Sequence, residues 1–285
     1  MPDSSSPDLS RASDLKQSET GFWRQQYYLL LAAVVFFTRI PVSTQLPDWS
    51  LQLNRTARFL PVVGLGLGIL SALSFMLFFA LWHSIWLALV LSTVVSVLLT
   101  GAFHEDGFAD SCDGFGGGWQ KEQVLRIMKD SRLGTYGAVG LGLLLTVKLS
   151  ALNLLSAEQI PWLLVLGHTL SRSVSASFMF SMDYVRDEVD RKFSGHSDKM
   201  SLKEVSLVWS VGIVCSLLIL SLAVIPGSLF LTLLILLVCL GLLKQLLAWY
   251  WRKRIGGYTG DCLGGAQQLA EVVIYLALSA YWLNV

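Results

Sequence analysis

Long apolar stretches alternate with shorter polar ones from about residue 25 to the end of the chain. A helix needs about 20 mostly apolar residues to cross about 30 Å of hydrocarbon. The segment 60–103 contains one ionisable residue, His83, and breaks near it into two apolar helices. The segment 205–243 has no charged residue and breaks at 226–228. Both segments predict helical hairpins that cross a membrane.

Three further apolar segments, 137–156, 161–180 and 269–285, are also candidates for membrane spans. The segment 25–38 is the doubtful case, because only 14 residues separate the arginines that flank it. It predicts either a short tilted span or a helix at the membrane surface. The expected fold is all-α, a polytopic integral membrane helical bundle with about seven to eight hydrophobic segments.

The first 21 residues are polar and rich in Ser, Asp and Pro, which predicts a flexible tail that buries too little surface to fold. This polar stretch precedes the first apolar segment, so a cleaved secretory signal is not expected. Residues 22–285 are expected to form a single membrane-embedded domain.

Composition agrees with the apolar pattern. The chain is 54% hydrophobic and 14% charged, where a soluble domain is about 25% charged. A formal net charge of +1 gives no basic excess for binding nucleic acid, so the expected surrounding is a lipid bilayer. The 4 cysteines form no C-x-x-C pair, which argues against a disulfide framework or a structural zinc site.

Charged residues gather on one side of the predicted bundle. Four long connections hold 15 of the 21 basic and 14 of the 20 acidic residues, while the short connections opposite hold no Lys or Arg. Short connections rich in Lys and Arg stay in the cytoplasm, so we expect the chemistry to face it. A transporter would more often place its decisive charges near the middle of the membrane. The four connections are 39–59, 104–136, 181–204 and 249–268.

The densest polar cluster follows the second apolar helix. Asp106, Asp110 and Asp113 are spaced i, i+4 and i+7, which places them within roughly 60° on one helical face. Carboxylates this close repel one another unless they share a cation, and their oxygens suit Mg²⁺, which also binds substrate phosphates. The spacing favours a Mg²⁺ site, with Glu105 as a further ligand and His104 orienting a carboxylate or acting in catalysis. A solvated acidic face is the alternative.

A glycine-rich run and an amphipathic segment come next. The glycines at 114–118 could bring backbone amides close to a phosphate, although no Walker A sequence follows. Residues 120–129 predict an amphipathic helix at the membrane surface, and the basic residues after it could bind phosphate oxygens. The excess of basic residues in cytoplasmic loops would also explain the presence of either Lys129 or Arg132 taken singly. The candidate phosphate-binding residues are Gly117, Gly118, Lys129, Asp130, Ser131 and Arg132.

A second glycine-rich segment carries an acid just before the last span. Asp261 lies among five glycines, with Thr259 and Gly260 before it. This arrangement favours Asp261 completing a metal or hydroxyl site, with its two neighbours binding substrate, over a simple turn.

Ionisable residues inside the spans have two explanations. Arg172 and His168 share a helical face at i, i+4, and an intramembrane Arg usually faces a polar cavity, so Arg172 is a candidate for substrate binding. For Lys148 and Lys244, a side chain that reaches toward the interface is an alternative explanation.

Three motifs together resemble one family. They are G-x-F-H-x-D-G-x-A-D-x-x-D-G at 101–114, K-D-S-x-x-G at 129–134 and G-x-T-G-D-x-L-G at 257–264. This set resembles the cobalamin synthase family, the adenosylcobinamide-GDP ribazoletransferases, and the likeness extends from about residue 29 onward. One departure is small, since Lys129 stands where members of the family often have Arg.

The resemblance implies the joining of adenosylcobinamide-GDP with α-ribazole, or its 5′-phosphate, with release of GMP. It implies Mg²⁺ held by the acidic run, a leaving nucleotide held by Lys129 and Arg132, and a proton taken by one carboxylate of the run or by Asp261. The expected location is the prokaryotic inner membrane, multi-pass, with the active site facing the cytoplasm. A homo-oligomer and an association with other cobamide-assembly enzymes both stay open.

Two other classes of membrane protein fit the sequence less well. The CDP-alcohol phosphotransferases carry the motif D-G-x-x-A-R followed by G-x-x-x-D-x-x-x-D. In this chain no Arg follows Ala109, and the last two aspartates are three residues apart instead of four. A cation-coupled transporter expects charges at mid-membrane and an internal repeat, and neither is convincing in the sequence.

Overall fold

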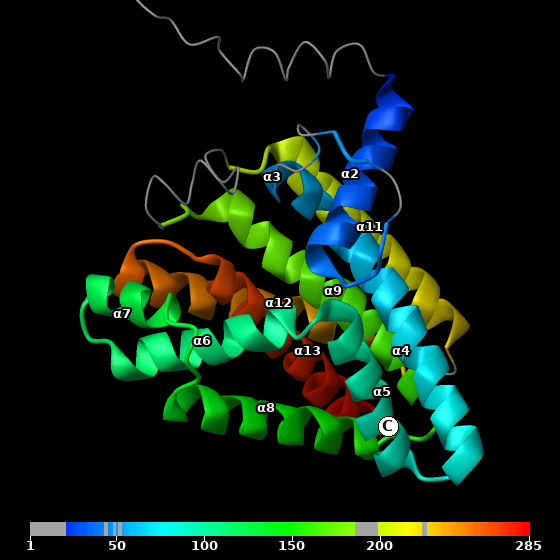
Figure 1. Cartoon of the computed structure of the whole chain (residues 1–285). Coiled ribbons are helices and arrows are strands. Elements are labelled where there is room, and N and C mark those ends of the chain that lie inside the picture. The colour runs from blue at the N-terminus through cyan, green and yellow to red at the C-terminus, as the bar shows by residue number, and fades with distance from the viewer. Residues whose placement is uncertain (1–20, 43–44, 48–49, 51–52, 186–198, 224–226) are drawn as a thin grey trace, which may run out of the picture.

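A computed structural model describes residues 21–42, 45–47, 50, 53–185, 199–223 and 227–285. Within these ranges the regular structure is helical, with one isolated parallel bridge between Tyr184 and Tyr258 (Figure 1). The elements are α2 (Phe22–Phe37), α3 (Leu53–Thr56), η2 (Ala57–Phe59), α4 (Leu60–Trp82), α5 (Ile85–Thr100), α6 (Phe103–Gly117), α7 (Lys121–Met128), α8 (Thr135–Asn153), α9 (Ile160–Ser181), α11 (Leu202–Leu222), α12 (Leu229–Ile255) and α13 (Gly260–Trp282).

The prediction of an all-α polytopic membrane protein is confirmed. Five helices in the described ranges are long and apolar enough to cross a membrane: 57–82, α8, α11, α12 and α13. A sixth span results if α5 and α6, which bend by 90° at a short break, count as one. The predicted division into a tail and one domain stays a prediction, and residues 1–20 lie outside the described ranges.

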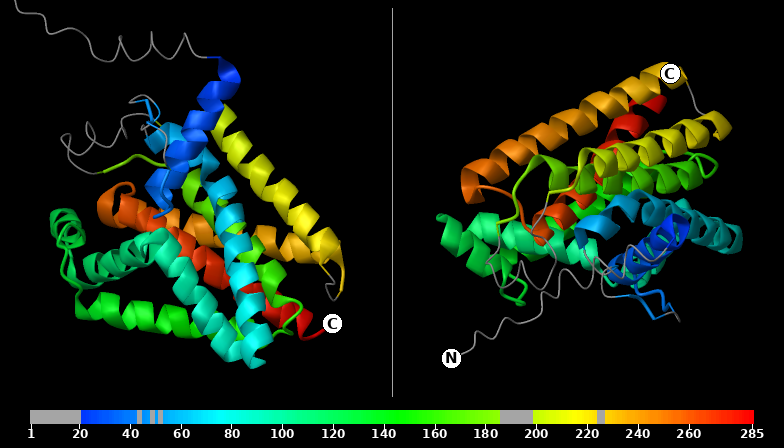
Figure 2. Two further views of the ribbon diagram at one scale, coloured as in Figure 1. Left: turned by 45° about the vertical axis from the view of Figure 1, so that its right-hand side comes forward. Right: turned by 90° about the horizontal axis from the view of Figure 1, so that it is seen from above.

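The helices run between two ends of the bundle. The ends of α4, α8 and α11 and the starts of α5, α9 and α12 lie together toward the lower right in the left view of Figure 2, beside the C-terminus. We call this the turn end. The starts of α4, α8, α11 and α13 and the ends of α5, α9 and α12 lie at the opposite end, which we call the site end (Figure 2). The described parts of the four charge-rich connections belong to the site end.

Helix α2 does not cross the bundle. Near its start, Gln26 Oε1 accepts a hydrogen bond from Arg58 Nη2 at 3.0 Å. Just past its end, Arg39 N donates to Leu99 O at 2.7 Å. Both partners belong to the site end, so α2 covers that end, in keeping with the surface-helix alternative for 25–38.

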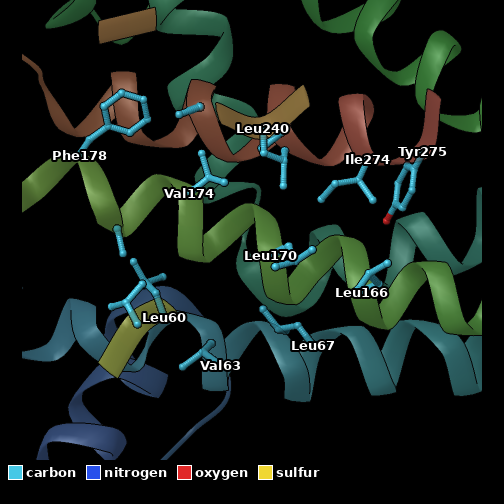
Figure 3. Close-up of a cluster of buried hydrophobic side chains, with 14 of the residues drawn as sticks. Leu60, Val63, Leu67, Leu166, Leu170, Val174, Phe178, Leu240, Ile274 and Tyr275 are labelled. Atoms are coloured by element: carbon cyan, nitrogen blue, oxygen red, sulfur yellow. The ribbon is translucent and has the colours of Figure 1, made fainter. Parts of the chain in front are cut away.

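Helix α9 is the central helix. Every residue from Leu163 to Met179 is buried, with α4 on one side and α13 on another (Figure 3). Helix α9 is less apolar than the five candidate spans. It can carry polar residues because they are buried against other helices and do not face lipid. Close backbone approach to α4 depends on Gly68, where an added Cβ would lie 2.7 Å from Val165 Cα. The core around it includes Leu60, Val63, Leu67, Leu166, Leu170, Val174, Phe178, Leu240, Ile274 and Tyr275.

A sharp bend separates α5 from α6. Gly101 and Ala102 both have left-handed backbone, with φ of 66° and 59°. Such a conformation is unfavourable for Ala, so the surrounding packing has to hold it. The bend sends α6 across the site end (Figure 1). Most of the predicted connection 104–136 is therefore helix, namely α6 and α7.

Candidate functional site

Close contact between α6 and α13 brings two predicted acidic elements together. A Cβ added at Gly107 would lie 3.1 Å from both Cα and O of Asp261, and one at Gly264 would lie 3.1 Å from His104 O. Glycine at both positions lets the two backbones approach without side chains between them. The N-terminus of α13, with Asp261 in its first turn, therefore lies against the first half of α6.

The three aspartates of α6 differ in exposure. Asp106 is exposed and Asp110 is half-buried, whereas Asp113 is buried. Asp113 accepts hydrogen bonds from Gly134 N and Gly137 N, each at 2.8 Å. These amides belong to the cap and first turn of α8, so this carboxylate caps α8, and the helix dipole adds to the attraction.

Asp113→Ala should lower the free energy of unfolding by about 1–2 kcal/mol, because two α8 amides lose their acceptor. Asp113→Asn keeps a carbonyl oxygen and should lose less. Thermal unfolding in detergent measures both, and an alanine variant as stable as the wild type would contradict the capping role.

Glu105 and His104 point into the bundle. Glu105 is buried, and its Oε1 accepts a hydrogen bond from Gln268 Nε2 at 2.9 Å. His104 is also buried and lies edge-on to the Phe103 ring, with centroids 5.3 Å apart. It lines a cavity of about 40 Å³ whose other walls include Phe37 and Leu263. Asp106 and Asp110 mark the more exposed face of α6, which we call its outward face. Neither Glu105 nor His104 lies on it.

The structure does not gather the predicted metal ligands into one set. Among the residues that it describes, no three His, Cys, Asp or Glu side chains are close enough to hold a metal ion. Glu105 faces Gln268, and both oxygens of Asp113 accept backbone amides. The pair that stays on the outward face is Asp106 and Asp110. Two carboxylates suit an ion such as Mg²⁺, which keeps waters and takes further oxygens from a phosphate substrate.

The end of α7 lies beside the start of α13. Met128 packs against Gly114, and its Sδ accepts a weak hydrogen bond from Thr259 Oγ1 at 3.8 Å. Lys129 is the C-cap residue of α7 and follows this contact directly. Thr259 caps α13 by accepting from Cys262 N at 3.2 Å. The predicted motifs at 129 and 259 are thus neighbours in space.

Asp130 and Arg132 form an exposed pair. Arg132 Nη2 lies 2.6 Å from Asp130 Oδ2, and Arg132 Nε donates to Oδ1 at 3.0 Å. These hydrogen bonds hold the pKa of Asp130 below its ordinary value. Ser131 lies between them and is exposed. An exposed guanidinium held in this way can exchange partners with a phosphate at small cost.

The glycine run after α6 packs against neighbouring helices. Gly114 to Gly117 form its last turn, and Gly118 N donates to Gly114 O at 2.9 Å. Gly118 lies against Val124 of α7, while its carbonyl accepts a hydrogen bond from Arg254 at 2.5 Å. The Gly118 amide is therefore used within the helix. The phosphate role of Gly117 and Gly118 stays a prediction, and Arg254 is a structural contributor that the sequence analysis missed.

A buried polar network lies between the site end and the turn end. Lys148 Nζ and Glu271 Oε1 form an ion pair at 2.8 Å, and Tyr275 and Gln267 also donate to Glu271, at 2.9 and 2.8 Å. Lys148 is 5% exposed, so its explanation as a side chain reaching toward the interface is wrong. Sequence analysis missed Glu271, although Gln267, Glu271 and Tyr275 share one face at i, i+4 and i+8.

Arg172 belongs to this buried network. It is 1% exposed, and its Nη1 lies 3.0 Å from both Nδ1 and O of His168. The predicted shared face with His168 is confirmed. The burial of Arg172 distinguishes it from Asp106, which is exposed. Lys244, by contrast, is half-buried and donates to Ser177 O at 3.3 Å.

Comparison with known proteins gives consistent matches. A family model described as cobalamin-5-phosphate synthase matches residues 29–279. The adenosylcobinamide-GDP ribazoletransferase of Shewanella piezotolerans is 45% identical over 259 residues, which cover 90% of this chain and 96% of the relative. The protein of that name from Shewanella frigidimarina is 43% identical over 265 residues, covering 92% and 98%. No solved structure matches the chain.

Proposed function

Because this chain belongs to the cobalamin-5-phosphate synthase family, we propose that it is an adenosylcobinamide-GDP ribazoletransferase. It joins adenosylcobinamide-GDP to α-ribazole, or to its 5′-phosphate, and releases GMP. The observation that carries the chemistry is the contact of α6 with α13, which brings the acidic face of α6 to Asp261. Carboxylates beside basic residues at one end of a bundle suit transfer of a phosphate group.

The reaction exchanges one phosphorus–oxygen bond for another. A ribose hydroxyl of α-ribazole attacks the cobinamide-side phosphorus, the bond from that phosphorus to the bridging oxygen breaks, and GMP leaves with that oxygen. The hydroxyl proton passes to a carboxylate. Asp261 and Asp110 are the candidates for this base, since both lie where α6 meets α13.

Asp106 and Asp110 would hold Mg²⁺, which neutralises charge on the diphosphate when bound. Lys129 and Arg132 bind the phosphates of the leaving nucleotide, and Arg132 exchanges its partner Asp130 for them. The amides at the start of α13, at Gly260 and beyond, add the positive end of a helix dipole. This set of residues stabilises negative charge as it moves toward GMP.

The membrane setting follows from the apolar helices, and the finer location is part of the proposal. We place the protein in the inner membrane of a prokaryote with the site end in the cytoplasm. The support is the concentration of Lys and Arg at the site end, because such residues stay on the cytoplasmic side. Both substrates are soluble in water and would reach the site from that side.

The test is release of GMP by the purified protein in liposomes, given adenosylcobinamide-GDP, α-ribazole and Mg²⁺. We expect GMP only when both substrates are present, with a corrinoid product that contains the lower base. A parallel sample receives a CDP-alcohol and an acceptor alcohol. Release of CMP there with no GMP in the first sample would favour the CDP-alcohol phosphotransferase alternative, and absence of GMP alone would contradict the proposal.

A further inference from the structure

Helix α6 is held by polar contacts near both of its ends. Near its C-terminus, Asp113 accepts two amides of α8. Near its N-terminus, Glu105 accepts a hydrogen bond from Gln268 of α13 at 2.9 Å. Helices α8 and α13 are joined in turn by the ion pair between Lys148 and Glu271 at 2.8 Å. These three contacts link each of the helices α6, α8 and α13 to the other two.

The contact between Glu105 and Gln268 is the one nearest the outward carboxylates. Glu105 precedes Asp106 directly, and Gln268 follows Asp261 by seven residues, which is about two helical turns. Gln268 and Asp261 therefore lie on the same side of α13. A hydrogen bond between Glu105 and Gln268 fixes how far α6 slides along α13 and how it is rotated.

Burial makes the loss of this hydrogen bond costly. Glu105 is 8% exposed and Gln268 is 2% exposed. Glu105 Oε2 and Gln268 Oε1 have no hydrogen-bond partner in the structure. Loss of the single amide donor would leave a buried carboxylate with no hydrogen bond from a side chain, which is costly, so α6 would shift to find another donor.

The glycine and serine contacts beside this pair do not select one register by hydrogen bonding. Gly107 and Gly264 allow the backbones to touch, but they contribute no hydrogen bond that would select one register. Ser111 lies beside Gly265 with its Oγ unpartnered, so it gives no polar link either. The hydrogen bond between Glu105 and Gln268 therefore supplies a directional contact between α6 and α13 that the glycines and Ser111 do not supply.

We propose that Glu105 and Gln268 form a positioning pair that holds Asp106 and Asp110 in register with Asp261. The pair does not touch the substrates and acts through α6. This assignment rests on the proposed function and gives Glu105 a role different from that of a metal ligand.

The test removes the hydrogen bond and then rebuilds it in reverse. Gln268→Met keeps the shape of the side chain without a donor, and we expect kcat to fall about 10- to 100-fold with little change in KM, as expected for a small misplacement of reacting groups. The double variant Glu105→Gln, Gln268→Glu again pairs an amide with a carboxylate, and it should recover kcat to within about threefold of the wild type. Ser216→Ala, a buried change on α11 whose hydroxyl bonds only to Gly212 O, is the matched control and should keep wild-type kcat.

A second readout does not depend on the reaction. Hydrogen exchange of the backbone amides in α6 should be faster in Gln268→Met than in the wild type and should return to the wild-type rate in the double variant. A folded Gln268→Met protein with wild-type kcat and exchange would overturn the proposal. A folded double variant no better than Gln268→Met in both readouts would also overturn it. Wild-type protein that releases no GMP but shows the expected exchange pattern would contradict the proposed function and leave the positioning pair supported.

Discussion

Asp110→Asn should lower GMP release by about 10²- to 10³-fold, the usual cost of removing a group that stabilises charge or moves a proton in the transition state. Asp110 is half-buried on the outward face of α6, close to where Gly107 meets Asp261. The amide has the shape of the carboxylate but lacks its charge and its ability to accept a proton. The measurement is the initial rate of GMP release in liposomes at several concentrations of Mg²⁺.

Glu122→Gln is the matched control for that experiment. Glu122 is an exposed carboxylate in the first turn of α7, so the same chemical change there should leave the rate within about twofold of the wild type. Turnover by Asp110→Asn equal to that of the wild type would refute both the metal role and the base role of Asp110. It would leave the identity of the reaction untouched, because the wild-type assay decides that.

Lys148→Met should destabilise the protein by about 3–5 kcal/mol, because it leaves the Glu271 carboxylate buried without its cation. Glu271 has no exposed surface and would keep the hydrogen bonds from Gln267 and Tyr275 and the more distant attraction of Arg172. Urea or thermal unfolding in a fixed detergent, followed by circular dichroism, measures the loss. The size of this effect distinguishes a buried ion pair from a surface one, which is worth about 0–1 kcal/mol.

Removal of both charges should cost much less than removal of one. In Lys148→Met, Glu271→Gln the amide can still accept from Tyr275 or Gln267, so we expect recovery of at least half of the lost stability. Lys244→Met is the control, since that lysine is half-buried, donates to a backbone carbonyl and lies over the Phe178 ring at 5.6 Å. A Lys148→Met protein as stable as the control would contradict the importance of the ion pair.

The sequence predicted well those features that depend on local pattern. Apolar length marked α4, α8, α11 and α12, because a lipid-facing helix must be apolar over most of its surface. Helical spacing placed Asp106 and Asp110 on one face of a helix. The motifs around 129 and 259 were expected to serve one site, and Met128 and Thr259 do lie in contact.

Features that depend on contacts between distant segments could not be predicted in this way. Helix α13 begins at Gly260, nine residues before the apolar segment that predicted it, because its first turns face α6 and not lipid. Glu271 looked unremarkable without Lys148, which comes from a helix more than 100 residues earlier. Asp113 was grouped with the outward carboxylates by spacing and Glu105 was added as a further ligand, and only the amides of α8 and Gln268 reveal their separate contacts.

The bend at Gly101 and Ala102 has a consequence for the surrounding bilayer. Helix α5 has 16 residues, a length of about 24 Å, whereas the hydrocarbon layer is about 30 Å thick. Since α6 turns away at 90°, the pair is too short on this side of the bundle to match an ordinary bilayer. Hydrophobic mismatch of this kind is relieved when nearby lipids thin the membrane. A bilayer that does not thin would leave the acidic helix recessed relative to the headgroups, so lipid chain length becomes a physical variable that sets how deeply the substrates must reach.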